Sequence, residues 1–314
     1  MVYTLDKLVV YMRVSSRCID GIVQYWNLGG SDCGSDYGEI YKFWIGHHPA
    51  VCRHNYTIQS ETGETWYFGV GQYAKAPNEF WEDVKIEFNP AKVGRSKWFA
   101  AFYDTLIASA KYVDFKRFDI AIDIPVARSR LRLLKDQRKY TLIEYSKDNK
   151  TEYLGVRSSH GQVKLYNKAL EQKIEGDLTR LEITMDYEKA TWVEFQRIFP
   201  RVFSVSDASP PDGLTGTDLV LFLSCSDNPD YLRLLSRDKR KKIEHLLATS
   251  AQYIKPDELL YRGILSQILY YGKHVKADMW ADFAENCIDD DIPDAWKPKV
   301  FNPLDGEQVD FTGG

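Results

Sequence analysis

The stretch from Arg117 to Ile124, R-F-D-I-A-I-D-I, decides the fold expected of this chain. Every second residue from Phe118 to Ile124 is large and apolar, and the residues between them are small or acidic. This period of two is typical of a β-strand with one buried face. Pro125 follows directly and ends the strand, because proline has no N–H for the hydrogen-bond ladder. The stretch therefore predicts a sheet with one face turned to a core.

Segments with strand-like and helix-like patterns lie on both sides of this strand. Further strands are expected at 5–13, 65–69, 85–88, 140–145, 151–156, 163–166 and 179–185. Helices are expected at 18–26, 96–112, 170–174, 192–198, 217–223, 237–247 and 256–271, whereas 31–60 reads as irregular. Asp148 and Asn149 lie between two of the strands and indicate a hairpin turn. The expected fold class is α+β: a central, mainly antiparallel sheet, helices packed on one face, and a helical C-terminal part.

The composition changes along the chain and suggests three regions. A stretch rich in Pro, Gly and Ser at 204–215 places a boundary near residue 205. We expect a catalytic domain at 1–204, a helical region at 205–275 that contributes to DNA binding or to a dimer, and an acidic tail at 276–314. From Asp278 onward there are ten acidic residues and two lysines, a local charge of −8, whereas the whole chain carries −4. The remaining body is therefore mildly basic, which is compatible with a nucleic-acid partner.

The chain shows no sign of a membrane or secreted protein. There is no apolar stretch of about 18 residues, and no basic segment precedes an apolar run at the N-terminus. The five cysteines are scattered and form no C-x-x-C pair, which indicates a reducing compartment and no zinc site. The cytoplasm is the expected location.

Polar residues collect on the second face of the predicted sheet. The charged or phenolic side chains at alternate strand positions are Lys85, Glu87, Asp119, Asp123, Lys164, Tyr166, Arg180 and Glu182. A solvated face of an antiparallel sheet can look like this. However, acidic residues are poor strand formers, and carboxylate oxygens suit Mg²⁺ or Mn²⁺, so a metal site is the alternative interpretation.

Strand geometry limits which carboxylates can share a metal ion. Asp119 and Asp123 are four residues apart, or about 13 Å along a strand, so both cannot bind one ion without a bulge. We expect Asp119 to be a ligand, with Glu182 and Glu87 from neighbouring strands. Asp123 is the alternative to Asp119.

Five short motifs occur in order along the chain. They are Glu87–Pro90 (E-F-N-P), Arg117–Asp123 (R-F-D-I-A-I-D), Tyr153–Arg157 (Y-L-G-V-R), Leu165–Lys168 (L-Y-N-K) and Arg180–Ile183 (R-L-E-I). In this order the motifs resemble the Rep_trans family, over roughly residues 5 to 270. Its members are replication initiators of Gram-positive rolling-circle plasmids and related relaxases of conjugative elements.

The resemblance implies a specific chemistry. Such proteins nick one DNA strand at an origin and remain attached to its 5′ end through a phosphotyrosine, while the freed 3′-OH primes replication. The tyrosine of the Y-N-K motif is Tyr166 here, and the metal-ligand candidates are Asp119 and Glu182. The family also implies a homodimer, origin DNA as duplex and single strand, and a host helicase as partner.

A tyrosine nucleophile needs help, because its ordinary pKa is about 10. Lys168 and Arg157 are expected near Tyr166 as catalytic cations, and Lys164 is a third candidate. Lys164, Asn167 and Arg180 are also expected to contact DNA. Each role has an ordinary alternative, since tyrosines mostly pack, and carboxylates in strands mostly form ion pairs.

A basic run lies on the helix expected at 237–247. Its cations are Arg237, Lys239, Arg240, Lys241 and Lys242, and they could bind duplex phosphates. A solvated helix face is the alternative.

Three other functions remain open. A relaxase of a conjugative element would use the same chemistry. An origin-binding protein without catalysis would keep the fold, and a metal-dependent nuclease that uses water would leave no covalent bond to DNA.

Overall fold

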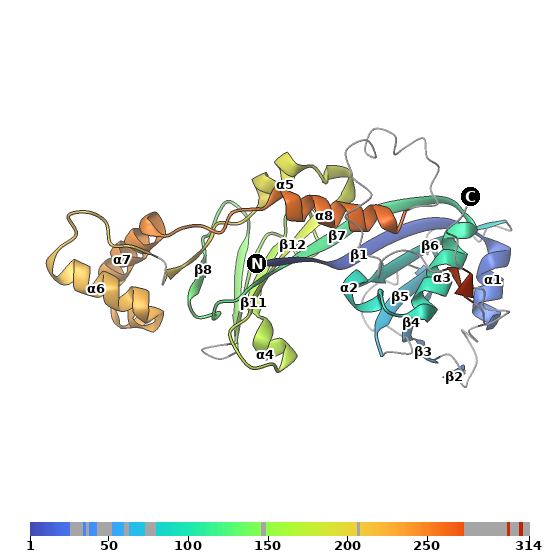
Figure 1. Ribbon diagram of the computed structural model, residues 1–314, viewed down its shortest axis with the longest axis horizontal. Helices are drawn as coiled ribbons and strands as arrows, with labels where there is room; N and C mark the ends of the chain where they lie inside the picture. The colour runs from blue at the N-terminus through green and yellow to red at the C-terminus, as the bar shows by residue number, and fades with distance from the viewer. Residues whose placement is uncertain are drawn as a thin grey trace. The chain divides into compact units, whose positions relative to one another are not determined.

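The computed structural model describes residues 1–25, 34–35, 38–42, 52–59, 63–72, 80–145, 149–205, 208–272, 300–301 and 308–309 (Figure 1). The chain divides into two compact units. The amino-terminal unit comprises Thr4–Asp119, Asp186–Glu188 and Arg262–Gly314, and the central unit comprises Met1–Tyr3, Ile120–Met185 and Lys189–Tyr261. The central unit holds the candidate tyrosine.

The amino-terminal unit is built on a sheet whose strands neighbour one another in the order β2-β3-β4-β5-β6-β1-β7. Their bounds are β1 Val2–Ser15, β2 Gly34–Ser35, β3 Gly38–Lys42, β4 Cys52–Gln59, β5 Thr65–Gln72, β6 Trp81–Phe88 and β7 Ala110–Ile124. β1 pairs antiparallel with β6, and Tyr11 lies opposite Lys85. β7 continues from Ile120 into the central unit.

One face of this sheet is covered by helix α3 (Lys97–Ala108). Its N-terminus is capped by the Ser96 side chain, which accepts a hydrogen bond from the Phe99 N–H. Phe99 and Phe102 are buried against Trp66, with ring centroids 5.2 and 5.5 Å apart. Three large rings buried together explain why this helix stays on the sheet. The other helices with residues in this unit are α1 Ser16–Tyr25, α2 Pro90–Val93 and α8 Glu258–Tyr270.

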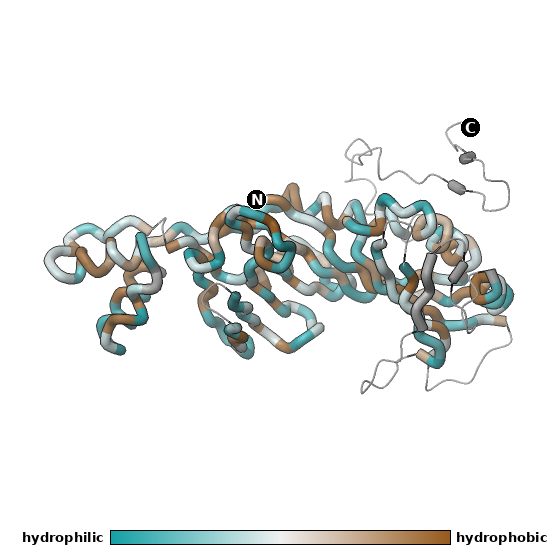
Figure 2. The backbone as a smooth tube through the Cα atoms, turned by 90° about the horizontal axis from the view of Figure 1, so that it is seen from below, coloured by the Kyte–Doolittle hydropathy of each residue, from teal (hydrophilic) through white to brown (hydrophobic). Residues whose placement is uncertain are grey.

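The central unit contains a second antiparallel arrangement. Its strands neighbour one another in the order β7-β12-β11-β10-β9, with β9 Tyr140–Glu144, β10 Lys150–Leu154, β11 Val163–Asn167 and β12 Thr179–Asp186. A separate ribbon pairs β8 (Leu131–Leu133) with β13 (Val202–Ser204). Hydrophilic and hydrophobic residues alternate along the strands, as Figure 2 shows. In β10 this alternation buries Glu152 and Leu154 on one face, whereas β9 has no buried residue.

The helices of the central unit are α4 Lys168–Gln172, α5 Trp192–Ile198, α6 Gly216–Asp227 and α7 Arg237–Ser250, with a 3₁₀ turn η3 at Pro229–Leu234. Another 3₁₀ turn, η1 at Tyr187–Lys189, lies mostly in the amino-terminal unit. α6, η3 and α7 form a helical module around a small core. Its buried residues are Phe203, Val205, Phe222, Cys225, Leu232, Ile243 and Leu247. Because the basic side chains of α7 lie away from Ile243 and Leu247, the module presents them to solvent.

The α+β class predicted from the sequence is confirmed, as is the hairpin of β9 and β10. The prediction that 31–60 is irregular was wrong, because β3 and β4 are strands in which Tyr56 and Ile58 are buried. The helix predicted at 96–112 ends at Ala108, since Ser109 caps it and β7 begins at Ala110. Strands β8 and β13 were not predicted; each has only three residues.

The predicted boundary near residue 205 does not coincide with an end of either unit, because the central unit continues to Tyr261. The acidic tail predicted at 276–314 lies outside the described residues, except for the short strands β14 Val300–Phe301 and β15 Gln308–Val309. None of the described helices has the length and apolar character needed to cross a membrane.

Replacing Phe222 by alanine should destabilise the helical module by about 3–5 kcal/mol, because this fully buried ring would leave a cavity. Hydrogen exchange of α6 and α7, followed by mass spectrometry, measures the free energy of local opening. The neighbouring Leu223 is half exposed, so Leu223→Ala is the matched control and should change it by about 0.5 kcal/mol or less. Equal effects of the two substitutions would contradict the core assignment.

Candidate active site

The candidate site is organised by the pairing of β11 with β12. In this antiparallel register Tyr166 lies opposite Arg180, and Lys164 lies opposite Glu182. The intervening residues Val163, Leu165, Leu181 and Ile183 are fully buried on the other face. The polar side chains of the two strands therefore share one face, as the sequence predicted.

Tyr166 is hydrogen-bonded to a carboxylate on the neighbouring strand. Its hydroxyl donates to Oε1 of Glu182 at 2.6 Å. Glu182 is the diagonal neighbour of Tyr166 across the strand pair, and a long side chain can bridge this spacing. The second oxygen of Glu182, Oε2, lies 3.4 Å from Nζ of Lys164. The carboxylate thus joins a potential nucleophile to a cation.

Two lysines lie over the aromatic ring of Tyr166. Nζ of Lys164 is 4.0 Å from the ring centroid and Nζ of Lys168 is 5.7 Å from it. Both distances fall within the range of cation–π attraction. The tyrosine side chain is accordingly well covered, with only 6% of its surface exposed.

The resting phenol is a weak acid. Burial is the largest cause that raises the pKa of Tyr166 above its ordinary value, and the negative charge and hydrogen bond of Glu182 raise it further. A phenolate is therefore not the resting form. Attack by this oxygen needs a base that removes the proton as the new bond forms, and Glu182 is placed to do so.

Two residues of the Y-N-K motif have clear local roles. The Asn167 side chain caps α4 by accepting a hydrogen bond from the Leu170 N–H at 2.9 Å. Lys168 is buried and forms an ion pair with Glu171. Their predicted contacts with DNA and phosphate remain predictions.

Arg180 binds the carboxylate that was the alternative metal ligand. Its Nε and Nη2 donate to the two oxygens of Asp123 at 2.6 and 2.8 Å. This two-point geometry is the strongest kind of ion pair. Asp123 is therefore bound by Arg180, and the prediction of Asp119 as a metal ligand remains a prediction.

The candidate metal ligands divide between the two units. Glu182 belongs to the central unit, whereas Asp119 and Glu87 belong to the amino-terminal unit. Burial alone would raise the pKa of Glu87, but Lys7 and Lys85, at 2.8 and 2.7 Å, outweigh it and hold this pKa below its ordinary value. Both Glu87 oxygens are thus engaged by lysines.

Within the described residues, no group of three His, Cys, Asp or Glu side chains is placed to hold a metal ion. Mg²⁺ does not require three protein ligands, because it commonly binds one or two carboxylates together with substrate phosphates and water. Glu182, a partly exposed carboxylate with one weakly engaged oxygen, fits that kind of site. The donor set is therefore compatible with Mg²⁺ or Mn²⁺.

The remaining predicted residues lie on exposed segments. Arg157 is exposed in the loop after β10, where Gly155 adopts a positive φ of 88°. On α7, Arg237, Lys239 and Lys241 are exposed, and Arg240 is half-buried. Lys242 forms an ion pair with Asp218 of α6 at 2.5 Å.

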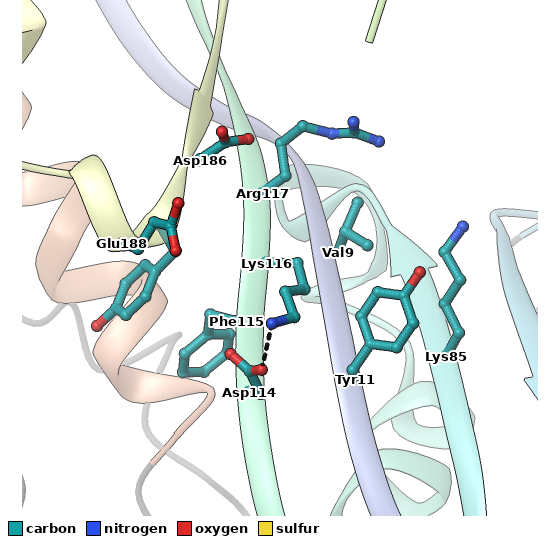
Figure 3. A pocket seen from close by; sticks show the side chains of 10 residues that line it. Val9, Tyr11, Lys85, Asp114, Phe115, Lys116, Arg117, Asp186 and Glu188 are labelled. Atoms are coloured by element: carbon teal, nitrogen blue, oxygen red, sulfur yellow. Dashed lines mark ion pairs between the residues drawn. The ribbon is translucent and has the colours of Figure 1, made fainter. Parts of the chain in front are cut away.

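A cavity of about 460 Å³ lies in the amino-terminal unit (Figure 3). Its wall comes from β1, β6, β7 and the turn after β12, and the lining residues are Val9, Tyr11, Lys85, Asp114, Phe115, Lys116, Arg117, Asp186, Tyr187 and Glu188. Three cations are balanced by three carboxylates, and Lys116 is paired with Asp114 at 2.6 Å. The balance gives the cavity no preference for an anion.

A second tyrosine shows what distinguishes Tyr166. Tyr67 of β5 also lies beneath a lysine, with Nζ of Lys85 5.4 Å from its ring centroid, and Glu87 is its cross-strand neighbour. However, its hydroxyl donates to the Asn55 amide oxygen at 2.5 Å. An amide is a poor base, so the carboxylate acceptor distinguishes Tyr166 from Tyr67. Tyr140 shares this feature, since its hydroxyl donates to Oε1 of Glu152 at 2.8 Å and Nζ of Lys135 lies 4.3 Å from its ring centroid.

The sequence did not predict Glu182 as the acceptor of the Tyr166 proton. It identified both residues, but their contact depends on the register of two strands separated by α4 and its loop. If the two strands had been paired with Lys164 opposite Glu182, the diagonal contact between Tyr166 and Glu182 would have been predicted.

Comparison with known proteins relates the chain to replication initiation. No family model matches it. It is 28% identical to a replication initiation protein of Staphylococcus aureus over 193 residues. The aligned region covers 56% of this chain and 58% of that relative. Another replication initiation protein of S. aureus is 28% identical over 113 residues, or 34% of this chain and 35% of that protein. The chain thus spans less than two thirds of the length of these curated relatives.

A solved structure of a rolling circle replication initiator protein from Geobacillus stearothermophilus overlaps 78% of this chain and 96% of its own, with a TM-score of 0.37 and 12% identity. At so low a score the overlap carries no inference, and the fold stands on its own strand pairing. The sequence matches make the chain similar to replication initiation proteins.

Proposed function

We propose that this protein is a rolling-circle replication initiator, which nicks and rejoins one strand of origin DNA through Tyr166. The observation that carries the proposal is the 2.6 Å hydrogen bond from the Tyr166 hydroxyl to Glu182, beneath two lysines. The sequence similarity to replication initiation proteins supports the same class.

The proposed reaction is a transesterification. The Tyr166 oxygen attacks a backbone phosphorus, Glu182 takes the phenolic proton, and the bond from phosphorus to O3′ breaks. The departing O3′ takes up a proton from solvent, and the 5′ phosphate remains on the tyrosine. Because the phosphotyrosine is itself a phosphodiester, a later 3′-OH can reverse the step and rejoin the strand.

The neighbouring cations favour this reaction. Lys164 and Lys168 lie near the ring and can turn toward the phosphoryl oxygens as negative charge builds there. Arg157 is proposed as a further phosphate contact from its exposed loop. Since Tyr166 is almost fully covered, a DNA strand must displace neighbouring side chains to reach its oxygen.

A divalent metal ion is part of the proposal. Glu182 and Asp119 are the residues that would hold Mg²⁺ or Mn²⁺, with Glu87 as a further candidate. Bound there, the ion supplies a Lewis acid that polarises the scissile phosphate. Lys7 and Lys85 would have to release Glu87 before it could serve as a ligand.

The proposed partners follow from the same function. The exposed cations of α7, from Arg237 to Lys242, are proposed to bind duplex phosphates at the origin, with Lys164, Asn167 and Arg180 nearer the cut strand. A homodimer and a host helicase are proposed as well, and the cytoplasm as the location. A conjugative relaxase with the same chemistry is the alternative.

The burial of Tyr166 favours one second candidate, an origin-binding protein that does not cut DNA. A covered tyrosine with a raised pKa is also what a structural ion-pair network would contain. Such a protein would bind the origin and leave no adduct.

Tyr166→Phe should abolish the covalent adduct, because it removes only the attacking oxygen. Wild-type and variant proteins are incubated with an origin oligonucleotide, labelled at both ends, and Mg²⁺ or Mn²⁺, and run on denaturing gels. Tyr67→Phe is the matched control, since it also removes a hydroxyl beneath a lysine. If Tyr166→Phe still cleaves the DNA and leaves no adduct, the tyrosine mechanism is contradicted, and a nuclease that uses water as the nucleophile is supported instead.

Glu182→Gln should slow adduct formation about 10²–10⁴-fold, because glutamine keeps the shape of the acceptor but cannot take the proton. Single-turnover kinetics with saturating DNA measure the rate of the chemical step. The control is Glu175→Gln, at an exposed position after α4. An unchanged rate in Glu182→Gln would show that another group accepts the proton.

A further inference from the structure

The cavity of the amino-terminal unit has no role in the nicking reaction proposed above. Its volume is about 460 Å³, and all of its lining residues belong to that one unit. Cavities of this size are typical of sites for a small molecule or for one group of a larger ligand. The lining combines charged side chains of both signs with aromatic rings. A ligand that matches it has hydrogen-bond donors, hydrogen-bond acceptors and a flat apolar face.

Aromatic rings form part of the cavity wall. Tyr11 of β1 lies opposite Lys85 of β6, and Figure 3 shows its ring between the side chains of Lys85 and Lys116. Tyr11 is partly exposed. Phe115 is almost fully buried and packs against Tyr187, with ring centroids 5.3 Å apart. Tyr11 is therefore a ring that a ligand can reach, whereas Phe115 lies deeper in the wall.

Hydrogen-bonding groups of both kinds surround these rings. Lys85 and Arg117 supply donors, and Asp186 and Glu188 supply acceptors. Ion pairs among such side chains do not exhaust their capacity, because a carboxylate has about four lone-pair sites and a guanidinium has about five N–H donors. The three cations and three carboxylates of the wall also balance in charge. The wall thus matches a neutral polar ligand without requiring any of its charges to be unpaired.

An unpaired nucleobase has these properties. Its ring is flat and neutral, and its edges carry both donors and acceptors. Proteins that bind single strands stack such bases on aromatic side chains and form hydrogen bonds with their edges. A base inside a duplex does not enter such a cavity unless it leaves the stack. The cavity therefore suits one base of a single strand.

Two of the carboxylates proposed to hold the metal ion lie on the strands that line the cavity. Lys85 lines the cavity and binds Glu87 at 2.7 Å. Arg117 also lines it, and Phe118 between Arg117 and Asp119 is fully buried, so Arg117 and Asp119 share the other face of β7. A DNA strand that brings a phosphate to these carboxylates therefore passes the cavity.

We propose that the cavity binds one unpaired base of the origin strand. The base stacks on Tyr11, and side chains of both signs, among them Arg117 and Asp186, form hydrogen bonds with its edge. The assignment to DNA rests on the proposed function. Because these contacts reach a base and not a phosphate, they give the protein a sequence preference at one position. The residues of the cavity include neither Tyr166 nor any cation of α7.

The first test is a scan with abasic sites. Each nucleotide of a single-stranded origin oligonucleotide is replaced in turn by an abasic site, and fluorescence anisotropy measures its affinity for the protein. At one position the affinity should fall about 5- to 150-fold, the effect of one base stacked on an aromatic ring. In Tyr11→Leu the intact oligonucleotide should bind more weakly by a similar factor, and the abasic site at that position should have no further effect. A scan that is the same in the wild type and in Tyr11→Leu would overturn the proposal.

Two variants are controls for this scan. Tyr11→Phe keeps the ring and should give the wild-type scan. Tyr112→Leu removes a half-exposed tyrosine of the same unit that does not line the cavity, and it should also leave the scan unchanged. A loss in Tyr112→Leu equal to that in Tyr11→Leu would show a general effect on the sheet and contradict the proposal.

The second test uses the wild-type protein and does not depend on the folding of a variant. A 5-iododeoxyuridine placed at the sensitive position is irradiated in the complex, and the cross-linked peptide is identified by mass spectrometry. The cross-link is expected on Tyr11, because an aromatic ring stacked on the base lies next to the reactive carbon. A cross-link found solely on residues outside the cavity would contradict the proposal.

The third test separates a base from a phosphate. Arg117→Gln should weaken binding of the intact single strand and should leave the slope of log K against log salt unchanged, because no phosphate contact is lost. A slope that is shallower by about 0.7 would assign the cavity to a phosphate and overturn the proposal. Binding of a fully paired duplex should be the same in Tyr11→Leu and in the wild type.

Failure of the base site and failure of the proposed function give different results, since the scan measures binding alone. All binding is measured in the Tyr166→Phe background. A position that depends on Tyr11, without any nicking by the wild type, would leave the base site standing and reject the nicking function. Nicking by the wild type without any such position would reject the base site and leave the nicking function standing.

Discussion

The hydrogen bond between Tyr166 and Glu182 depends on one constraint, the antiparallel register of β11 and β12. A slip of one residue would send every polar side chain of these strands to the core face. Val163, Leu165, Leu181 and Ile183 are all fully buried, and they prevent such a slip. The same register places Lys164 beside Glu182. The pairing of β12 with β7 brings Arg180 within reach of Asp123. The hydrophobic core thus determines the geometry of the proposed chemistry.

Tyr166 must keep its proton in the resting protein and must lose it during the proposed reaction. At rest, burial and the charge of Glu182 keep the phenol protonated, so the tyrosine is stable and unreactive. The incoming phosphate brings the negative charge toward which the lysines can turn. Contacts with DNA away from the cut would help to hold the strand while neighbouring side chains open the way to Tyr166. Binding far from the reacting bond would then favour exposure of the nucleophile.

Much of this fold could be predicted from alternation alone. The strands around Phe118, Leu165 and Leu181 are evident, because large apolar residues recur every second position. The short strands β8 and β13 were missed, since three residues are too few to show a period. The sequence also identified Tyr166, Glu182 and Asp123 as residues of the polar face. It could not show that Arg180 forms an ion pair with Asp123 or that Tyr166 donates a hydrogen bond to Glu182. Those contacts follow from register and side-chain reach, which periodicity does not contain.

The central claim is that the Tyr166 oxygen becomes bonded to DNA. The most direct measurement is mass spectrometry of the trapped adduct after trypsin and nuclease digestion of the wild-type protein. The account predicts a nucleotide phosphate on Tyr166 within the tryptic peptide Leu165–Lys168. A nucleotide on any other tyrosine, or cleaved DNA with no modified peptide, would contradict it.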